Sequence, residues 1–203
     1  MSTVLRDTYI LLAATLGVTA LMAALSARAH VGGLGSLMMS LLGLGALFAT
    51  MYFRKSGWGL FFIFVFTGLE GLSLGPTLNF YLRTPHGAEV VGLAAGLTAG
   101  VFVALSGYVL VTKKDFSFLG GMLFVGLWLL LLSGLVLMFV DVPAASLTWS
   151  AVSVLLFSGY VLYDTSEIVR GGERNYIIAT VQLYLDVLNL FLSLLRVVSA
   201  LRD

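Results

Sequence analysis

The chain has 203 residues, of which 60% are hydrophobic and 10% are charged, whereas a soluble domain carries about 25% charged residues. This composition excludes a soluble globular protein and predicts an all-α integral membrane protein that has the lipid bilayer as its solvent. The formal net charge of +1 gives no electrostatic basis for binding nucleic acid. The lack of cysteine excludes disulfides and thiolate metal sites.

Seven apolar segments are long enough to cross a bilayer, which takes about 20 residues. The connections between them are short, so we expect a single seven-helix membrane domain over residues 1–203. The seventh span carries several polar residues, and a re-entrant segment is its alternative. In chain order, the predicted spans are Thr8–Ala27, Leu34–Phe53, Trp58–Tyr81, Ala88–Thr112, Phe116–Val140, Ser146–Ile168 and Tyr176–Ala200.

The positions of Lys and Arg predict the orientation, because positive charges favour the cytoplasmic side of a membrane. With seven spans and Arg196 left aside as intramembrane, three arginines lie on the side opposite the N-terminus: Arg28, Arg83 and Arg202. This distribution predicts a cytoplasmic N-terminus and a C-terminus outside. The residues on the predicted cytoplasmic side are Arg6, Arg54, Lys55, Lys113, Lys114, Arg170 and Arg174.

The third span, which contains "FTGLEGLSLGPTLNFY", holds an acidic residue and a proline. Glu70 is a candidate pore-lining carboxylate, and its alternative is an acid whose hydrogen bonds are satisfied by packing. Pro76 predicts a break in the helix, because proline has no N–H and leaves nearby carbonyl groups in need of other partners.

The fourth span has small residues spaced by four, at Gly92, Gly96, Gly100 and Ala104. Such a ladder lets neighbouring backbones approach closely. We expect it to pack inside the bundle, and a dimer interface is the alternative.

The last two spans contain "GYVLYDTSEIV" and "VQLYLDVLNLF", each with an aspartate inside an apolar run. Helical spacing places each aspartate on a polar stripe. Consecutive helices joined by a short loop are normally antiparallel neighbours, so we expect the stripes to face each other. The stripes are Ser150, Ser153, Tyr160, Asp164 and Glu167, and Gln182, Asp186, Asn189, Ser193 and Arg196.

Helical rise places Asp164 about 9 Å and Asp186 about 15 Å from the shared end, so the sequence permits contact without establishing it. Two adjacent carboxylates repel and therefore share a proton. Without that proton they attract a cation, and Ca²⁺ takes oxygen ligands. The pair is our candidate pH sensor, ion gate and Ca²⁺ site, with Tyr160, Gln182 and Asn189 lining the pore. The alternatives are an Asp164–Arg170 ion pair and a structural hydrogen bond at Asp186.

Three segments together resemble the Bax inhibitor-1 family of membrane proteins, also called the transmembrane Bax-inhibitor-motif (TMBIM) family. They are "FTGLEGLSLGPTLNFY", "GYVLVTKKDFSFLGGML" and "GYVLYDTSEIVRGGERNYIIATVQLYLDVLNLFLSLLR". Their order and spacing match along essentially the whole chain. Parts of two of these segments, "TKKDFSFLGGML" and "GGERNYI", are most similar to the bacterial YccA-type subgroup.

This resemblance implies a seven-helix fold with a central helix, and a pH-sensitive calcium leak across a bacterial inner membrane. The paired aspartates of the family fall on Asp164 and Asp186. The latch arginine at the inner end of the second helix falls nearest to Arg54, although Phe53 is the other candidate for that register. The subgroup is also linked to the membrane protease FtsH, as a modulator.

The residues and the resemblance together give two hypotheses: a proton-gated Ca²⁺ leak, and a regulatory membrane protein that engages FtsH without transport of its own. Intramembrane aspartyl proteases also use two aspartates on adjacent helices. However, Asp186 lies in "LYLD" and lacks the glycines of their "GxGD" context, so we expect neither an enzyme nor a cofactor.

Overall fold

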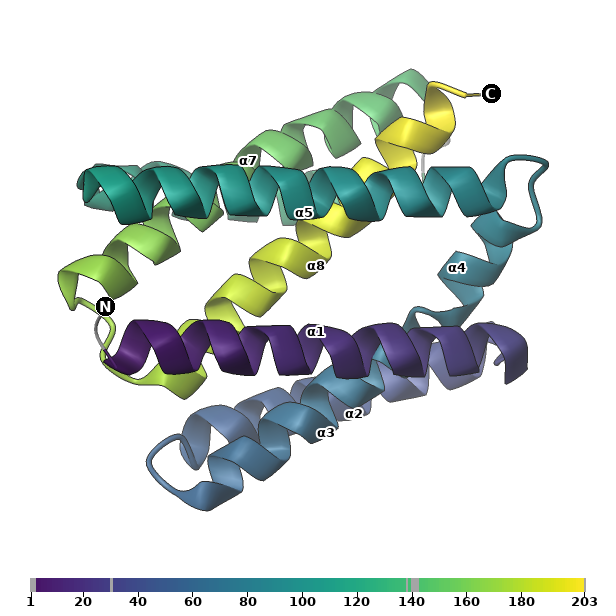
Figure 1. Ribbon diagram of the computed structural model, residues 1–203. Helices are drawn as coiled ribbons and strands as arrows, with labels where there is room; N and C mark the ends of the chain where they lie inside the picture. Colours follow the sequence, from purple (N-terminus) through teal and green to yellow (C-terminus); the bar gives the residue numbers. More distant parts are fainter. Residues whose placement is uncertain (1–2, 30, 138, 140–142, 203) are drawn as a thin grey trace. The chain divides into compact units, whose positions relative to one another are not determined.

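The computed structural model describes residues 3–29, 31–137, 139 and 143–202. Over these ranges it is helical, without strands (Figure 1). Seven segments are long and apolar enough to cross a membrane. The chain is therefore a multi-pass, all-α membrane protein, as its composition predicts. The elements are α1 (Thr3–Ala29), α2 (Gly33–Tyr52), α3 (Gly57–Ser73), α4 (Gly75–Leu82), α5 (Gly87–Thr112), the short 3₁₀ helix η1 (Ser117–Leu119), α6 (Gly120–Leu137), α7 (Pro143–Arg170) and α8 (Tyr176–Ala200).

The seventh span is one unbroken helix with the predicted bounds, Tyr176–Ala200. Its 25 residues extend about 37 Å, which is enough to cross a hydrocarbon core of about 30 Å. This length favours a full span over the re-entrant alternative. The predicted end of the fifth span, Val140, lies outside the described residues.

The helices fall into two compact units, and α8 contributes to both of them. The first unit comprises Met1–Ala88 and Glu173–Tyr184, and the second comprises Glu89–Gly172 and Leu185–Asp203. Two thirds of the apolar window of α8 is buried (67%), a larger share than in any other described span. This burial is the property expected of the central helix that the resemblance implies.

In the first unit, α3 packs against both α1 and α2 (Figure 1). The approach to α1 is close because Gly71 has no side chain. A Cβ atom at Gly71 would lie 2.5 Å from the carbonyl oxygen of Thr19 and 2.8 Å from Cβ of Met22. Replacement of this glycine by any other residue would therefore push α1 and α3 apart.

The third span is broken as Pro76 predicts: α3 ends at Ser73 and α4 begins at Gly75. A proline at position 76 cannot donate to the carbonyl of Leu72, four residues earlier. The hydroxyl of Ser26 donates to that carbonyl instead, at 2.6 Å. The hydroxyl of Ser36 likewise donates to the carbonyl of Ser73, also at 2.6 Å. Serines of α1 and α2 therefore satisfy the backbone groups that the break leaves open.

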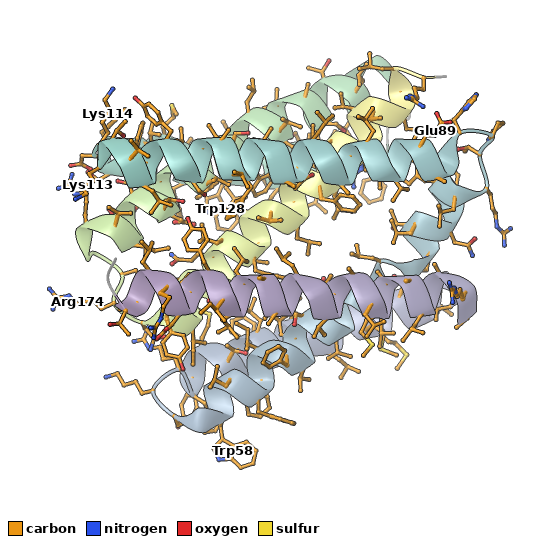
Figure 2. All side chains as sticks on the ribbon, in the orientation of Figure 1. Trp58, Glu89, Lys113, Lys114, Trp128 and Arg174 are labelled. Atoms are coloured by element: carbon orange, nitrogen blue, oxygen red, sulfur yellow. The ribbon has the colours of Figure 1, made fainter. Side chains whose placement is uncertain are left out.

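In the second unit, α6 and α7 pack as an antiparallel pair in which glycines of α6 face large side chains of α7. A Cβ atom at Gly120 would lie 3.1 Å from the Tyr163 ring, and one at Gly134 would lie 3.2 Å from the Trp149 ring. Because both contacts keep the same register, the two helices follow each other along their length. Figure 2 shows Glu89 at one end of α5 and the lysines 113 and 114 at the other.

The glycine ladder of α5 lies on an exposed face of the helix. Gly92, Gly96 and Gly100 are exposed, and a Cβ atom at any of them would meet no described atom within 4 Å. Within the second unit, these three glycines therefore pack no helix closely, and the expectation that the ladder packs inside the bundle stays a prediction. In that unit, α5 contacts α7 through another face, where Ser106 and Thr165 approach to 3.3 Å.

Candidate functional site

The two membrane-buried aspartates are in contact in the second unit. Asp164 of α7 is 5% exposed and Asp186 of α8 is 4% exposed. Their side chains lie within hydrogen-bonding reach of each other. Because an ionised carboxylate can only accept, a hydrogen bond between the two groups needs a proton on one of them. The arrangement therefore permits the two carboxyl groups to share a proton.

The direction of side chains in a helix explains how the aspartates meet despite their different backbone depths. Each Cα–Cβ bond tilts toward the N-terminus of its own helix. In α8, which begins at the shared end, Asp186 leans toward that end. In α7, which finishes there, Asp164 leans away from it. Both tilts reduce the offset, an effect that depths counted along the backbone leave out.

One oxygen of the pair lacks a hydrogen bond in the described part of the chain: Oδ2 of Asp186 is buried without a partner. A buried polar atom without a partner costs about 1–3 kcal/mol. A proton or a cation at this oxygen would remove that cost.

Asp164 belongs to a run of three consecutive buried polar residues near the end of α7. Consecutive helical residues point about 100° apart, and here each contacts a different element. Asp164 reaches α8, and Thr165 lies 3.3 Å from Ser106 of α5. The hydroxyl of Ser166 accepts from the N–H of Phe116 at 3.0 Å. The rotation of α7 is therefore fixed on three sides around the aspartate pair.

The connection between α5 and η1 pairs with the end of α7. Asp115 forms an ion pair with Arg170, so the alternative in which Arg170 pairs with Asp164 is not what the structure shows. The N–H of Ser117 also donates to Asp115 at 2.9 Å. This backbone hydrogen bond, with the Arg170 guanidinium as a further cause, holds the pKa of Asp115 below its usual range.

The predicted pore-lining residues divide between the two units. Tyr160 is half-buried one turn before Asp164 and interacts electrostatically with both aspartates. Asn189 is half-buried, and its amide donates to the Leu185 carbonyl of its own helix at 2.7 Å. Gln182 is half-buried and belongs to the first unit.

Glu70 and Arg54 also belong to the first unit. Glu70 is half-buried against α2, where a Cβ atom at Gly43 would lie 2.8 Å from Oε1 of the carboxyl group. Arg54 is exposed in the turn after α2, and its carbonyl accepts from Nδ2 of Asn175 at 2.8 Å. Its role as a latch stays a prediction.

Sequence reasoning missed how the first half of α8 attaches to α1. The hydroxyls of Tyr184 and Thr19 lie 2.8 Å apart, and the Thr19 hydroxyl also lies 2.9 Å from the carbonyl of Thr67. The hydroxyl of Thr180 lies 3.3 Å from the carbonyl oxygen of Thr8. Buried Thr and Tyr at helical spacing were the available signal. The partners were not predictable, because each contact joins residues far apart in the chain.

The described residues contain no group of three or more His, Cys, Asp or Glu side chains that could hold a metal ion. Asp164 and Asp186 supply carboxylate oxygens, whereas Ca²⁺ takes six to eight oxygen ligands in proteins. The two aspartates alone therefore supply fewer ligand groups than a resident Ca²⁺ site takes.

Comparison with known proteins gives one family match and several similar chains. The model of the family "Inhibitor of apoptosis-promoting Bax1" matches residues 1–203. An uncharacterized membrane protein of Vibrio cholerae is 45% identical over 98% of this chain and 90% of its own. The "Modulator of FtsH protease YccA" of Escherichia coli K12 is 44% identical over 98% of this chain and 91% of its own.

The same identity and coverage hold for the "Inner membrane protein YccA" of Escherichia coli O6:H1. A family match over the whole sequence and identities above 40% across nearly all of both chains leave one assignment. The chain belongs to the family of inhibitors of apoptosis-promoting Bax1, the Bax inhibitor-1 family that its sequence resembles.

Proposed function

We propose that this chain is a bacterial inner-membrane protein that modulates an FtsH-type protease. The observation that carries the proposal is the 44% identity, over 98% of this chain, to a relative whose name describes that role. The second relative named as an inner membrane protein supports the location. The excess of Lys and Arg at one set of helix ends supports a cytoplasmic N-terminus and a C-terminus outside.

Two measurements on the full chain in native membranes test this role. The tagged chain is purified in mild detergent and FtsH is quantified in the eluate, with an unrelated seven-span protein under the same tag as control. Turnover of a known FtsH substrate is then followed with and without the chain. We expect FtsH in the eluate and a changed turnover rate. Recovery no greater than the control, with unchanged turnover, would contradict the proposal.

A second function, a pH-sensitive cation leak, is favoured by one specific observation. The aspartates at 164 and 186 are buried beside each other, and among the described residues Oδ2 of Asp186 has no hydrogen-bond partner. We propose that the shared proton holds α7 to α8, and that its loss frees two carboxylates to receive a cation such as Ca²⁺. Resident cofactors and catalysis form no part of this proposal.

Calcium flux into liposomes, measured against pH, tests the leak. We expect flux through the native chain to vary with pH. The double variant Asp164→Asn, Asp186→Asn should lose this dependence, because two amides hydrogen-bond to each other at every pH. Asp7→Asn is the control, since it removes a carboxyl group that pairs with Arg6 and lies outside the aspartate pair. A pH dependence that survives in the double variant would eliminate the aspartates as the sensor.

A further inference from the structure

A groove of about 760 Å³ lies between α6 and α7 in the second unit. Its volume falls within the range of about 300–1,000 Å³ that is typical of small-molecule sites. The lining is almost entirely aliphatic, with leucines 129, 130 and 156 and Val152 among its residues. Neither of the proposed functions uses this groove.

The walls of the groove are fixed by close contacts between the two helices. A Cβ atom at Gly126 would lie 2.7 Å from Cδ1 of Leu156, and Gly134 lies beside the ring of Trp149. The indole N–H of Trp149 donates to the Leu130 carbonyl at 2.9 Å. This hydrogen bond holds the indole ring in one orientation at the side of the groove.

The length of the groove matches one leaflet of a bilayer. Its lining runs from Gly126 to Leu137 on α6 and from Ala145 to Leu156 on α7. Each of these segments rises about 16 Å, and half of a hydrocarbon core is about 15 Å. The groove begins where α6 ends and α7 starts, at one membrane face, and stops near the middle. A transmembrane helix of a partner would need a groove about twice as long.

A positive charge lies beside Trp149, one of the residues that line the groove. The guanidinium carbon of Arg196 lies 5.1 Å from the centre of the Trp149 ring, and Arg196 is exposed four residues before the end of α8. Tryptophan favours the membrane interface. Arginine binds phosphate through paired hydrogen bonds while its planar group stacks on an aromatic ring.

We propose that this groove binds one acyl chain of an anionic phospholipid, whose phosphate group is held by Arg196 beside Trp149. The aliphatic lining and the length of one leaflet select the acyl chain. The arginine selects the negative charge. Together, the aliphatic groove and the arginine beside its Trp149 wall distinguish this site from an apolar lipid-facing surface that carries no charge.

Native mass spectrometry of the full chain tests the proposal. The protein is released from detergent micelles that contain equal amounts of phosphatidylglycerol and phosphatidylcholine. We expect phosphatidylglycerol to stay bound under collisions that remove phosphatidylcholine. Val152→Trp places an indole in the groove and should abolish this retention. Leu155→Trp, at an exposed position of the same helix outside the lining, should leave it unchanged.

Arg196→Gln should leave lipid bound but remove the preference for phosphatidylglycerol. Lys113→Gln, at the opposite end of the spans, should keep that preference. Leu129→Trp fills the groove from α6 and serves if Val152→Trp does not fold. Equal retention of phosphatidylglycerol in the native chain, Val152→Trp and Leu129→Trp would overturn the proposal. Two other results would also overturn it. One is a dimer mass that Val152→Trp removes, and the other is binding of glycerol phosphate as strong as that of the lipid.

Discussion

At the scale of single residues, the aspartate pair depends on neighbours that hold it in place. Thr165 and Ser166, next to Asp164, contact α5 and the N–H of Phe116. The end of α7 is also held through Arg170, which pairs with Asp115. The charged contact lies at the surface, whereas the aspartates are buried. We therefore expect acid to affect the Asp115–Arg170 ion pair and the pair of buried aspartates independently.

Asp115 predicts a loss of stability in acid. Its pKa in the folded chain lies below the unfolded value of 3.8, chiefly because Ser117 donates a backbone hydrogen bond. Its stabilising contribution is therefore complete above about pH 4 and disappears as the pH falls through the folded pKa. Asp115→Asn should reduce the fall in Tm between pH 5 and pH 3, measured in detergent by thermal unfolding. The effect should be small, because the group is exposed.

Glu173→Gln is a suitable control for that experiment, since it removes another carboxyl group, from the connection that follows α7. An unchanged acid profile in Asp115→Asn would show that the ion pair with Arg170 and the bond from Ser117 contribute nothing measurable.

At the scale of elements, the connection between α7 and α8 is built from a terminator and a cap. Gly171 has φ +79°, and the N–H groups of Gly171 and Gly172 bond to the carbonyls of Ile168 and Glu167. This is a Schellman motif, which ends α7. Oδ1 of Asn175 then accepts from the N–H groups of residues 177 and 178 and starts α8. The Schellman motif sets where α7 ends, and the Asn175 cap sets where α8 begins.

Asn175→Ala should destabilise the chain by about 1 kcal/mol, because the first turn of α8 loses its cap. Asn175→Asp should restore most of this loss, since a carboxylate caps a helix as well as an amide does. The measurement is unfolding in detergent for the three proteins. A deficit in the aspartate variant as large as that of the alanine variant would assign the effect to the lost contact with the Arg54 carbonyl instead.

The contact between α8 and α1 also gives a prediction. Thr19→Val, Tyr184→Phe and the double variant form a cycle around the 2.8 Å contact of the two hydroxyls. Hydrogen bonds between membrane helices average about 0.6 kcal/mol in such cycles. We expect a coupling of about that size from unfolding free energies. Strict additivity of the two single variants would mean that the contact does not stabilise the fold.

Much of this fold was predictable because each part depended on a local property. Hydropathy located all seven spans, and the missing N–H of Pro76 located the break after α3. The contact of Asp164 with Asp186 was only permitted, because backbone depths ignore the lean of side chains. The pairing of Asp115 with Arg170 was not predicted, since the residues are far apart in sequence and only the fold brings them together. The glycines of α6 gave no indication of which helix they face.

At the scale of the whole molecule, the proposed orientation in the membrane can be tested by labelling single cysteines. The chain has no cysteine, so single cysteines can be introduced without changing a background. Lys114→Cys and Glu89→Cys lie at opposite ends of α5 (Figure 2). In intact cells, a maleimide that cannot cross the inner membrane should label the cysteine at 89 and not that at 114. The reverse labelling pattern would invert the proposed orientation.

The sharing of α8 between the two units has a consequence for biosynthesis. Each unit takes one half of this helix, and α8 follows every other helix in the chain. The ribosome therefore releases the segment that completes both units after all their other parts have entered the bilayer. Until then, Asp164 and Thr19 lack the partners that α8 supplies, which are Asp186 and Tyr184.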